Sequence, residues 1–346
     1  MSGTRIELRT APHAHAPVDV PLIMRHVIYA LLPIVAWSVW LFGLGTLLLI
    51  LTVTATALAT ERLLGGEGGE RSIRDGSAVI TGLLLALTLP PAFPLWMGVV
   101  AAVAAIGLGK MLFGGLGMNP LNPALVGRAF VQAAFPASIT TWIPPLGAER
   151  FTSVAPSTLA PPFLRPEGLA EWIADQRVDA FTGATPLGLF KFDGVITPLR
   201  DLLAGTTAGS AGETPALLIV ACGLYLAFRR FLDWRIPLAV MAGVVLAAGP
   251  LHLLDAERFP DPWFMLLSGG LMLGAWFMAT DMVGSPVTPW GVLIYGLLIG
   301  LLTVVIRLFG GLSEGVMYAI LLANAATPLI ERLTQPRVFG AARRKE

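Results

Sequence analysis

The sequence has few charged residues for its length. Only 13% of its 346 residues are Asp, Glu, Lys or Arg, whereas 55% are hydrophobic, and the formal net charge is +1. Soluble domains carry about a quarter charged residues, so this composition excludes an ordinary soluble protein. No basic patch with interleaved aromatic residues occurs, so nucleic acid is not an expected partner.

Cysteine and histidine are also scarce. The single cysteine, Cys222, lies in an apolar run, where we expect a small buried packing residue. It cannot form an intrachain disulfide, and there is no cysteine cluster for an iron–sulfur or zinc site. Three of the four histidines lie near the N-terminus, and no nucleophile–His–acid set, P-loop or Gly-x-Gly-x-x-Gly motif is present. The chain is therefore predicted neither to hydrolyse a substrate nor to bind a nucleotide in a Rossmann site.

Apolar runs near membrane-spanning length recur along most of the chain, which predicts an all-α polytopic membrane protein of about ten segments. The fifth segment is too short to span unless loop backbone completes the crossing. No cleavable signal peptide precedes the first apolar run, so we expect that run to be retained. The predicted segments are 27–42, 44–59, 77–89, 95–113, 123–135, 214–228, 236–254, 263–278, 290–309 and 315–330.

Two short patterns recur in the same order in the two halves. Leu-Phe-Gly-Gly-Leu occurs at 112–116 and again at 308–312, while Trp-Met-Gly-Val at 96–99 is matched by Trp-Gly-Val at 290–292. Five segments per half is an odd number, so the halves would have opposite topology. This is the inverted-repeat plan of transporters and channels, in which broken helices meet near the midplane.

Lys and Arg residues near the short loops predict that both termini are cytoplasmic. The cytoplasmic side would then hold Arg25, Arg62, Arg71, Arg74, Lys110, Arg229, Arg230, Arg235 and the basic tail, against little beyond Arg258 and Arg307 outside. The expected organisation is a cytoplasmic N-terminal segment (1–26), a first membrane repeat (27–135), an extracytoplasmic loop (136–213), a second membrane repeat (214–331) and a cytoplasmic basic tail (332–346).

The longest polar loop contains Asp-Ala-Phe-Thr-Gly-Ala-Thr at 179–185. This run resembles the flavinylation signature Asp-x-x-Ser/Thr-Gly-Ala-Ser/Thr, in which the last hydroxyl becomes a phosphoester to FMN. Gly183 and Ala184 keep bulk away from Thr185, and Pro186 makes the exit rigid, so a modifying enzyme could reach the hydroxyl.

Two further residues of this run matter to the interpretation. Asp179 could hold a metal or orient the acceptor hydroxyl during transfer, and Thr182 offers a second hydroxyl nearby. The alternative is a surface turn in which Thr185 is an unmodified cap before a short helix. The seven residues by themselves leave both interpretations open.

Asn-Pro-Leu-Asn-Pro at 119–123 opens the fifth segment. The two Asn-Pro pairs predict an extended entry and a proline-started helix, whose first N–H groups lack intrahelical partners. With the amides of Asn119 and Asn122, this end suits a polar ring with carbonyl and imide groups, such as a flavin; helix capping alone is the alternative. Arg128, deeper in the segment, is costly there and is expected to face protein, a cofactor phosphate or water.

Several stretches together resemble the D subunit of Rnf complexes, over nearly the whole chain. They are Met-Asn-Pro-Leu-Asn-Pro-Ala-Leu-Val-Gly-Arg-Ala-Phe at 118–130, the run 179–186, and residues 279–289 and 318–328. The homologous B subunit of the sodium-pumping NADH:quinone reductase shares this plan. The compact N-terminus and the proline after Thr185 favour the Rnf family.

The resemblance implies an electron-transfer subunit of an ion-translocating ferredoxin:NAD⁺ oxidoreductase in a bacterial inner membrane, with a urea-channel-like fold. A separate flavin transferase that uses FAD would attach FMN to Thr185 outside the cytoplasm. The residues themselves predict that Asn119 and Asn122 line either a second, non-covalent flavin site, for example for riboflavin, or an ion gate near the cytoplasmic side. Arg128 would favour the reduced form of that flavin by its charge. The partners would be the other Rnf subunits, especially the flavinylated G-type subunit. The alternatives are a B-like component of the sodium-pumping reductase, or a small-solute channel or carrier with the same repeats.

Overall fold

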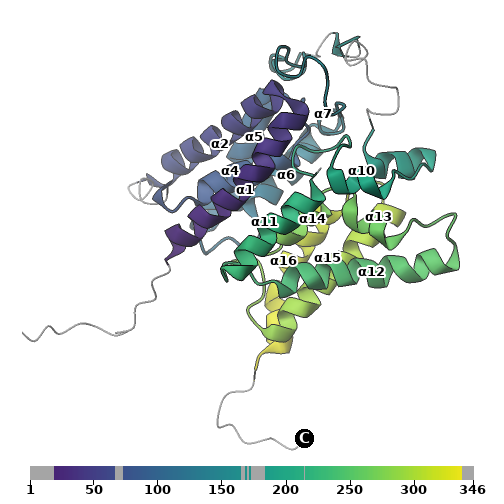
Figure 1. The fold of residues 1–346 in the computed structure, drawn as a ribbon. Coiled ribbons are helices and arrows are strands. Elements are labelled where there is room, and N and C mark those ends of the chain that lie inside the picture. Colours follow the sequence, from purple (N-terminus) through teal and green to yellow (C-terminus); the bar gives the residue numbers. More distant parts are fainter. Residues whose placement is uncertain are drawn as a thin grey trace, which may run out of the picture.

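The computed structural model describes residues 19–66, 73–164, 168–169, 171–172, 184–213 and 215–336, and these residues form helices and loops without a strand. The described part of the first half begins with the helices at the purple and blue end of the chain in Figure 1. They are α1 (Val20–Phe42), α2 (Leu44–Leu64), α4 (Ser77–Thr88), α5 (Leu95–Gly109), the 3-10 turn η2 (Met111–Phe113) and α6 (Pro123–Ala134).

Short elements then lead into the second half. The connecting region contains α7 (Pro136–Ile139), α9 (Pro186–Gly188), the π-helical turn η3 (Leu189–Asp193) and α10 (Leu199–Ala204). The second half contains α11 (Ala216–Phe228), α12 (Arg235–Leu254), α13 (Pro262–Leu267), α14 (Leu271–Leu273), the π-helical turn η4 (Gly274–Met278), α15 (Pro289–Phe309) and α16 (Val316–Thr334).

Six helices among the described residues are long and apolar enough to cross a membrane, which confirms a multi-pass membrane protein. They cover 20–42, 44–64, 95–113, 235–254, 289–309 and 316–334. The helices α4 and α6 have 12 residues each and α11 has 13. At about 1.5 Å per residue each of these covers roughly 18–20 Å, less than the ~30 Å hydrocarbon core. Six of the ten predicted segments thus have the length needed to span a membrane. That the other four also cross the membrane stays a prediction.

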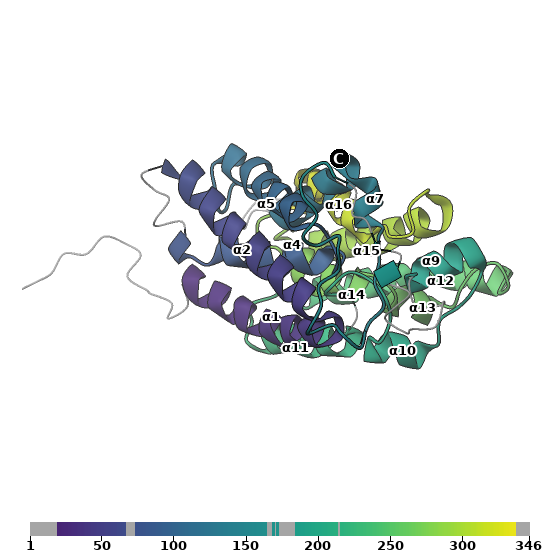
Figure 2. The same cartoon turned by 90° about the horizontal axis from the view of Figure 1, so that it is seen from above.

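Each half is a bundle, and the two bundles lie side by side in Figures 1 and 2. In the first half α2 packs on α4 and α5, and α5 packs on α6. In the second half α12 packs on α13 and α15, and α15 packs on α16. Between the halves α1 packs on α11 and α6 on α16. The α12–α15 contact is close because Gly243 and Gly300 meet backbone of the opposite helix, where a side chain would clash.

The predicted segment 263–278 is not one continuous helix. The helix α13 ends at Leu267, Ser268 is extended, and Gly269 takes a φ of +65° before α14 begins. A side chain on Gly269 would clash with the carboxylate of Glu314, so glycine is required by both conformation and space. The hydrophobic pattern continues through the break because residues on both sides of it are buried. Such a pattern predicts burial, but it does not predict whether the helix continues or breaks.

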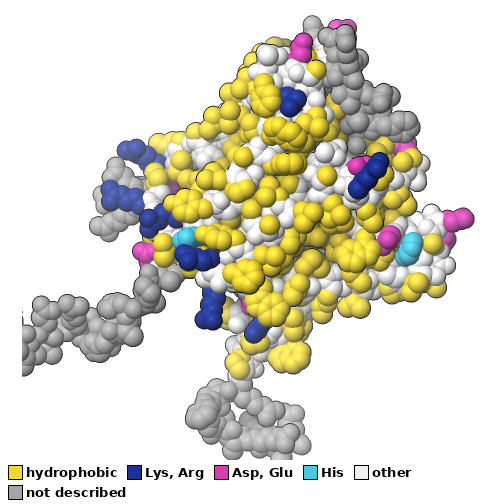
Figure 3. Space-filling view, viewed as in Figure 1, with side chains coloured by type: hydrophobic (Ala, Val, Ile, Leu, Met, Phe, Trp, Pro, Cys, Tyr) yellow, Lys and Arg dark blue, Asp and Glu magenta, His cyan; other side chains and the backbone are white. Residues whose placement is uncertain are grey.

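The first helix begins at Val20, earlier than the predicted Val27. Asp19 explains the difference, since its side chain accepts a hydrogen bond from the backbone N–H of Leu22 at 2.9 Å. On the surface, hydrophobic side chains cover most of the face seen in Figure 3. Lys and Arg gather near the start of α1 and the end of α11 in that view.

Candidate functional site

Thr185 begins the helical segment 186–193, which is formed by α9 and η3 and is called the attachment helix below. Its Oγ1 accepts a hydrogen bond from the backbone N–H of Gly188 at 3.1 Å, so the unmodified hydroxyl caps this helix. Thr185 and Ala184 are half-buried. Asp179, Thr182 and Gly183 lie outside the described residues. The residue predicted to carry FMN therefore lies at a helix start, with part of its surface open to solvent.

Lys191 connects the attachment helix to the C-terminal end of α15 by hydrogen bonds. The Lys191 ammonium donates to the backbone carbonyls of Gly310 at 2.5 Å, Leu312 at 2.7 Å and Arg307 at 3.1 Å. A cation at these terminal carbonyls also complements the helix dipole. Leu187 adds an apolar contact, since it is buried in a cluster with Leu202 and Phe264. Thr185 is thereby held at a defined place relative to the second half.

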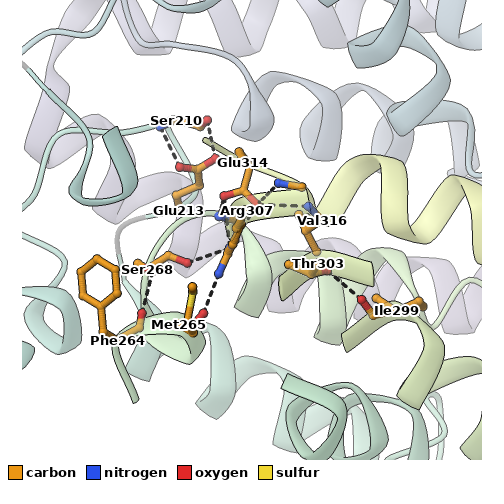
Figure 4. Close-up of polar contacts among 12 residues, drawn as sticks. Ser210, Glu213, Phe264, Met265, Ser268, Ile299, Thr303, Arg307, Glu314 and Val316 are labelled. Carbon is orange, nitrogen blue, oxygen red and sulfur yellow. Dashed lines mark hydrogen bonds and ion pairs between the residues drawn. The ribbon is translucent and has the colours of Figure 1, made fainter. Parts of the chain in front are cut away.

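Two buried ion pairs, Arg128–Glu213 and Arg307–Glu314, lie beside the break between α13 and α14, and we call these four residues the four-charge cluster. Figure 4 shows Glu213, Arg307 and Glu314. Arg307 donates to the carbonyls of Met265 at 2.6 Å and Ser268 at 3.0 Å, and to Glu314 at 3.1 Å. The side chain of Arg307 is 1% exposed. Its guanidinium thus donates hydrogen bonds to carbonyls that have no partner within the broken helix.

The two carboxylates complete the cluster. Glu314 accepts from the backbone N–H groups of Gly270 and Gly315 at 3.0 Å. Glu213 accepts from the Ser210 hydroxyl at 2.6 Å and lies 3.7 Å from Nη1 of Arg128, an ion pair that joins α6 to the connecting segment just before α11. Two positive and two negative charges balance, as buried charges require. The cluster holds the broken helix, α6 and the start of α16 together.

A second polar site lies at the end of the molecule where Figure 3 shows Lys and Arg. A cavity of about 370 Å³, called the inner cavity below, lies between α1, α4, the start of α6, the end of α11 and η4. Asn119 and Trp276 line it and are 3% and 2% exposed. Oδ1 of Asn119 and Nε1 of Trp276 have no hydrogen-bond partner among the described residues. Two residues that line the cavity thus carry an unpaired acceptor and an unpaired donor, and buried groups of this kind are costly to leave unpaired.

The other two residues predicted for this site are engaged elsewhere. Oδ1 of Asn122 accepts from the N–H groups of Ala124 at 3.0 Å and Leu125 at 3.3 Å, as an N-cap does. Nδ2 of Asn122 donates to the carbonyl of Met278 at 3.2 Å. Asn122 thus borders the cavity while its amide ties α6 to η4, and Arg128 belongs to the four-charge cluster instead of the cavity lining.

The sequence interpretation missed a buried ion pair at the edge of the inner cavity. Nζ of Lys110 lies 2.7 and 2.8 Å from the two carboxylate oxygens of Glu61 and 2.6 Å from the Ser77 hydroxyl. Lys110 is 1% exposed, although the sequence placed it among loop charges. The sequence did contain an indication of this pair, because Lys110 follows directly on an apolar helix. Ionisable residues in such positions of membrane proteins usually have a buried partner or a function.

Comparison with known proteins shows similarity along nearly the whole chain. The model of the NQR2, RnfD, RnfE family matches residues 7–340. The chain is 38% identical to the D subunit of the ion-translocating oxidoreductase complex of Alcanivorax borkumensis, over 96% of both chains. It is 38% identical to the D subunit of the Na(+)-translocating ferredoxin:NAD(+) oxidoreductase complex of Acetobacterium woodii, over 100% and 99% of the two chains. It is 37% identical to the D subunit of the proton-translocating ferredoxin:NAD(+) oxidoreductase complex of Clostridium ljungdahlii, over 97% and 96%.

Proposed function

Because this chain belongs to the NQR2, RnfD, RnfE family, we propose that it carries electrons, as the D subunit of an Rnf complex, on an FMN bound covalently to Thr185. The chain is a membrane subunit of an ion-translocating ferredoxin:NAD⁺ oxidoreductase, as its relatives over nearly their full length are. It acts as one part of a translocase. A flavin would supply the redox chemistry, and the protein would position it, shield it and set its potential.

The placement of Thr185 is the observation that carries the FMN proposal. Its side chain is half-buried, and the residue is the N-cap of the attachment helix, where the helix dipole favours a phosphate. Ala184 before it is small, and Pro186 needs no backbone N–H partner at the first helical position. The residues present fit a phosphoester at this oxygen.

The flavin proposal is tested most directly on the denatured wild-type chain. We expect a flavin-fluorescent band that survives boiling in a denaturing gel when the chain is made together with a flavin transferase. A chain that is only a solute channel or carrier would give no such band. The proposed partners are this transferase, the flavinylated G-type subunit and the other Rnf subunits.

We also propose that the ten helical segments form two inverted five-helix repeats of the urea-channel type. Corresponding helices have corresponding neighbours, since α2 contacts α4 and α5 as α12 contacts α13 and α15. In each half a Leu-Phe-Gly-Gly-Leu turn precedes the last helix, which is α6 in one half and α16 in the other. The broken segment 262–278 and the short α6 are typical of discontinuous helices in such folds.

The proposed orientation puts both termini in the cytoplasm and Thr185 outside, in a bacterial inner membrane. The basic residues near the start of α1 and the end of α11 support it. Reporter fusions at Gly168 and at the C-terminus should therefore give opposite compartment signals. Matching signals would require an even number of crossings between the two points and would contradict the inverted repeat.

For the inner cavity we propose a second, non-covalent flavin such as riboflavin. Its volume falls within the range of small-molecule sites, and a flavin edge offers both a carbonyl for Trp276 and an imide N–H for Asn119. A flavin without phosphate fits better, because the cation at the edge, Lys110, is already neutralised by Glu61. Asn122 would shape this site by holding α6 against η4.

Trp276→Phe tests the second flavin, since it removes the indole N–H while keeping an aromatic side chain. Losing one hydrogen bond of about 1.4 kcal/mol should weaken retention of the non-covalent flavin roughly tenfold. The measurement is flavin released on denaturation relative to covalent flavin. Trp290→Phe is the matched control, since Trp290 is 71% exposed. If wild type and both variants release equal amounts of non-covalent flavin, the proposal of a second flavin is rejected. The polar groups at the start of α6 would then serve only to cap this helix.

A further inference from the structure

A second cleft, of about 250 Å³, lies beside the attachment helix and is called the outer cleft below. One wall is the attachment helix with Phe190 and Lys191. The opposite wall is the loop between α12 and α13 with Glu257, Arg258 and Phe259, and the end of α15 closes the cleft with Phe309. The outer cleft thus joins the segment that begins at Thr185 to the second half.

Both walls of the outer cleft are fixed by hydrogen bonds. Lys191 fastens the attachment helix to the last carbonyls of α15. In the opposite loop, Oδ1 of Asp255 accepts from the N–H groups of Glu257 at 3.2 Å and Arg258 at 3.1 Å. Nδ1 of His252 lies 2.8 Å from the carbonyl of Phe259. A ligand entering the cleft would therefore meet walls that are already formed, which limits the entropy cost of binding.

The size and position of the outer cleft suit one part of a tethered molecule. Its volume lies below the ~300 Å³ at which sites for whole small molecules begin. Phe190 and Lys191 follow Thr185 by five and six residues, which corresponds to about 8–9 Å along a helix at 1.5 Å per residue. The extended sugar-alcohol phosphate of FMN is long enough to bridge a gap of this size. A ring held at the far end of such a tether would reach the cleft without its phosphate leaving Thr185.

The walls also carry the chemistry that a flavin ring needs. Phe259 and Phe309 are near each other, with ring centroids 6.3 Å apart, and provide apolar faces. The guanidinium of Arg258 lies 5.5 Å from the Phe259 ring centroid. Glu257, of opposite charge, lines the same cleft. Aromatic faces beside a cation and a carboxylate can both hold an isoalloxazine ring and shift its affinity for electrons.

We propose that the outer cleft receives the isoalloxazine ring of the FMN carried by Thr185, and that Arg258 and Glu257 set its potential in opposite directions. This inference rests on the proposed attachment at Thr185. A positive charge beside the ring favours the electron-rich reduced flavin, and a negative charge disfavours it. The ring would remain reachable from outside, because Glu257 and Arg258 are exposed.

The test is a redox titration of the covalent FMN in the assembled complex, with Arg258→Met and Glu257→Gln compared with wild type. We expect the midpoint potential to fall in Arg258→Met and to rise in Glu257→Gln, with both shifts smaller at high ionic strength. Arg200→Met is the matched control, because the Arg200 side chain is 86% exposed on α10 and is absent from the cleft lining. It should leave the potential unchanged.

Phe259→Leu provides a second, independent measurement, since it alters an aromatic contact without changing charge. The visible circular dichroism of the oxidised covalent flavin should change in Phe259→Leu and stay constant in Arg200→Met.

Unchanged potentials in both charge variants, or shifts of the same sign, would place the ring elsewhere and overturn the inference. Intact-mass analysis separates the two proposals, because a wild-type chain without flavin mass rejects the attachment itself and the ring site with it.

Discussion

Thr185→Ala is expected to yield a chain with no covalent flavin, the largest effect that the structure predicts. The substitution removes the only oxygen that the proposed phosphoester can use at this position. It also removes the hydrogen bond from Gly188, which as a helix cap contributes about 1 kcal/mol. A loss of that size at the start of the attachment helix should not prevent membrane insertion, because Lys191 and Leu187 still fasten this helix.

Intact-mass analysis of the purified chain measures this result, with a flavin transferase produced in the same cells. Thr185→Ser should keep the flavin, since it preserves the hydroxyl, and Thr182→Ser should keep it because both the signature and the attachment oxygen are preserved. Flavin mass on Thr182, or an unmodified wild-type chain under these conditions, would reject Thr185 as the attachment site.

Arg307→Met is expected to destabilise the protein by about 3–5 kcal/mol, the second largest effect, because it breaks a buried ion pair from one side. Methionine would leave Glu314 without its nearest cation and the carbonyls of Met265 and Ser268 without their donors. The broken helix between α13 and α14 depends on those contacts. We expect lower levels of the protein in the membrane and an earlier thermal transition of the purified complex.

Two further variants separate charge from packing at this position. Glu314→Gln in the Arg307→Met background should recover part of the stability, because it removes the uncompensated charge while keeping an acceptor for Gly270. Arg258→Met, on the exposed loop between α12 and α13, should cost less than about 0.5 kcal/mol. A transition for Arg307→Met as close to wild type as that of Arg258→Met would show that the four-charge cluster does not hold the fold.

Much of the architecture follows from local sequence. Long apolar runs predict helices in a membrane because a spanning backbone must satisfy its own hydrogen bonds, and six such helices are present. The Asn122–Pro123 pair predicts the start of α6, which is where this helix begins. Thr185 is recognisable because the proposed flavin transferase would read a short contiguous segment, and its capping role depends only on Gly188 three residues later.

The identity of each charged partner was decided by tertiary structure. Lys110 meets Glu61 across 49 residues, and the Lys191 ammonium binds carbonyls of Arg307, Gly310 and Leu312 that lie 116 to 121 residues away. Hydrophobic periodicity reports that a segment is buried, while it does not report what the segment is buried against. The break after α13 is hidden for the same reason, since the buried carbonyls of Met265 and Ser268 are satisfied by Arg307 from a different helix.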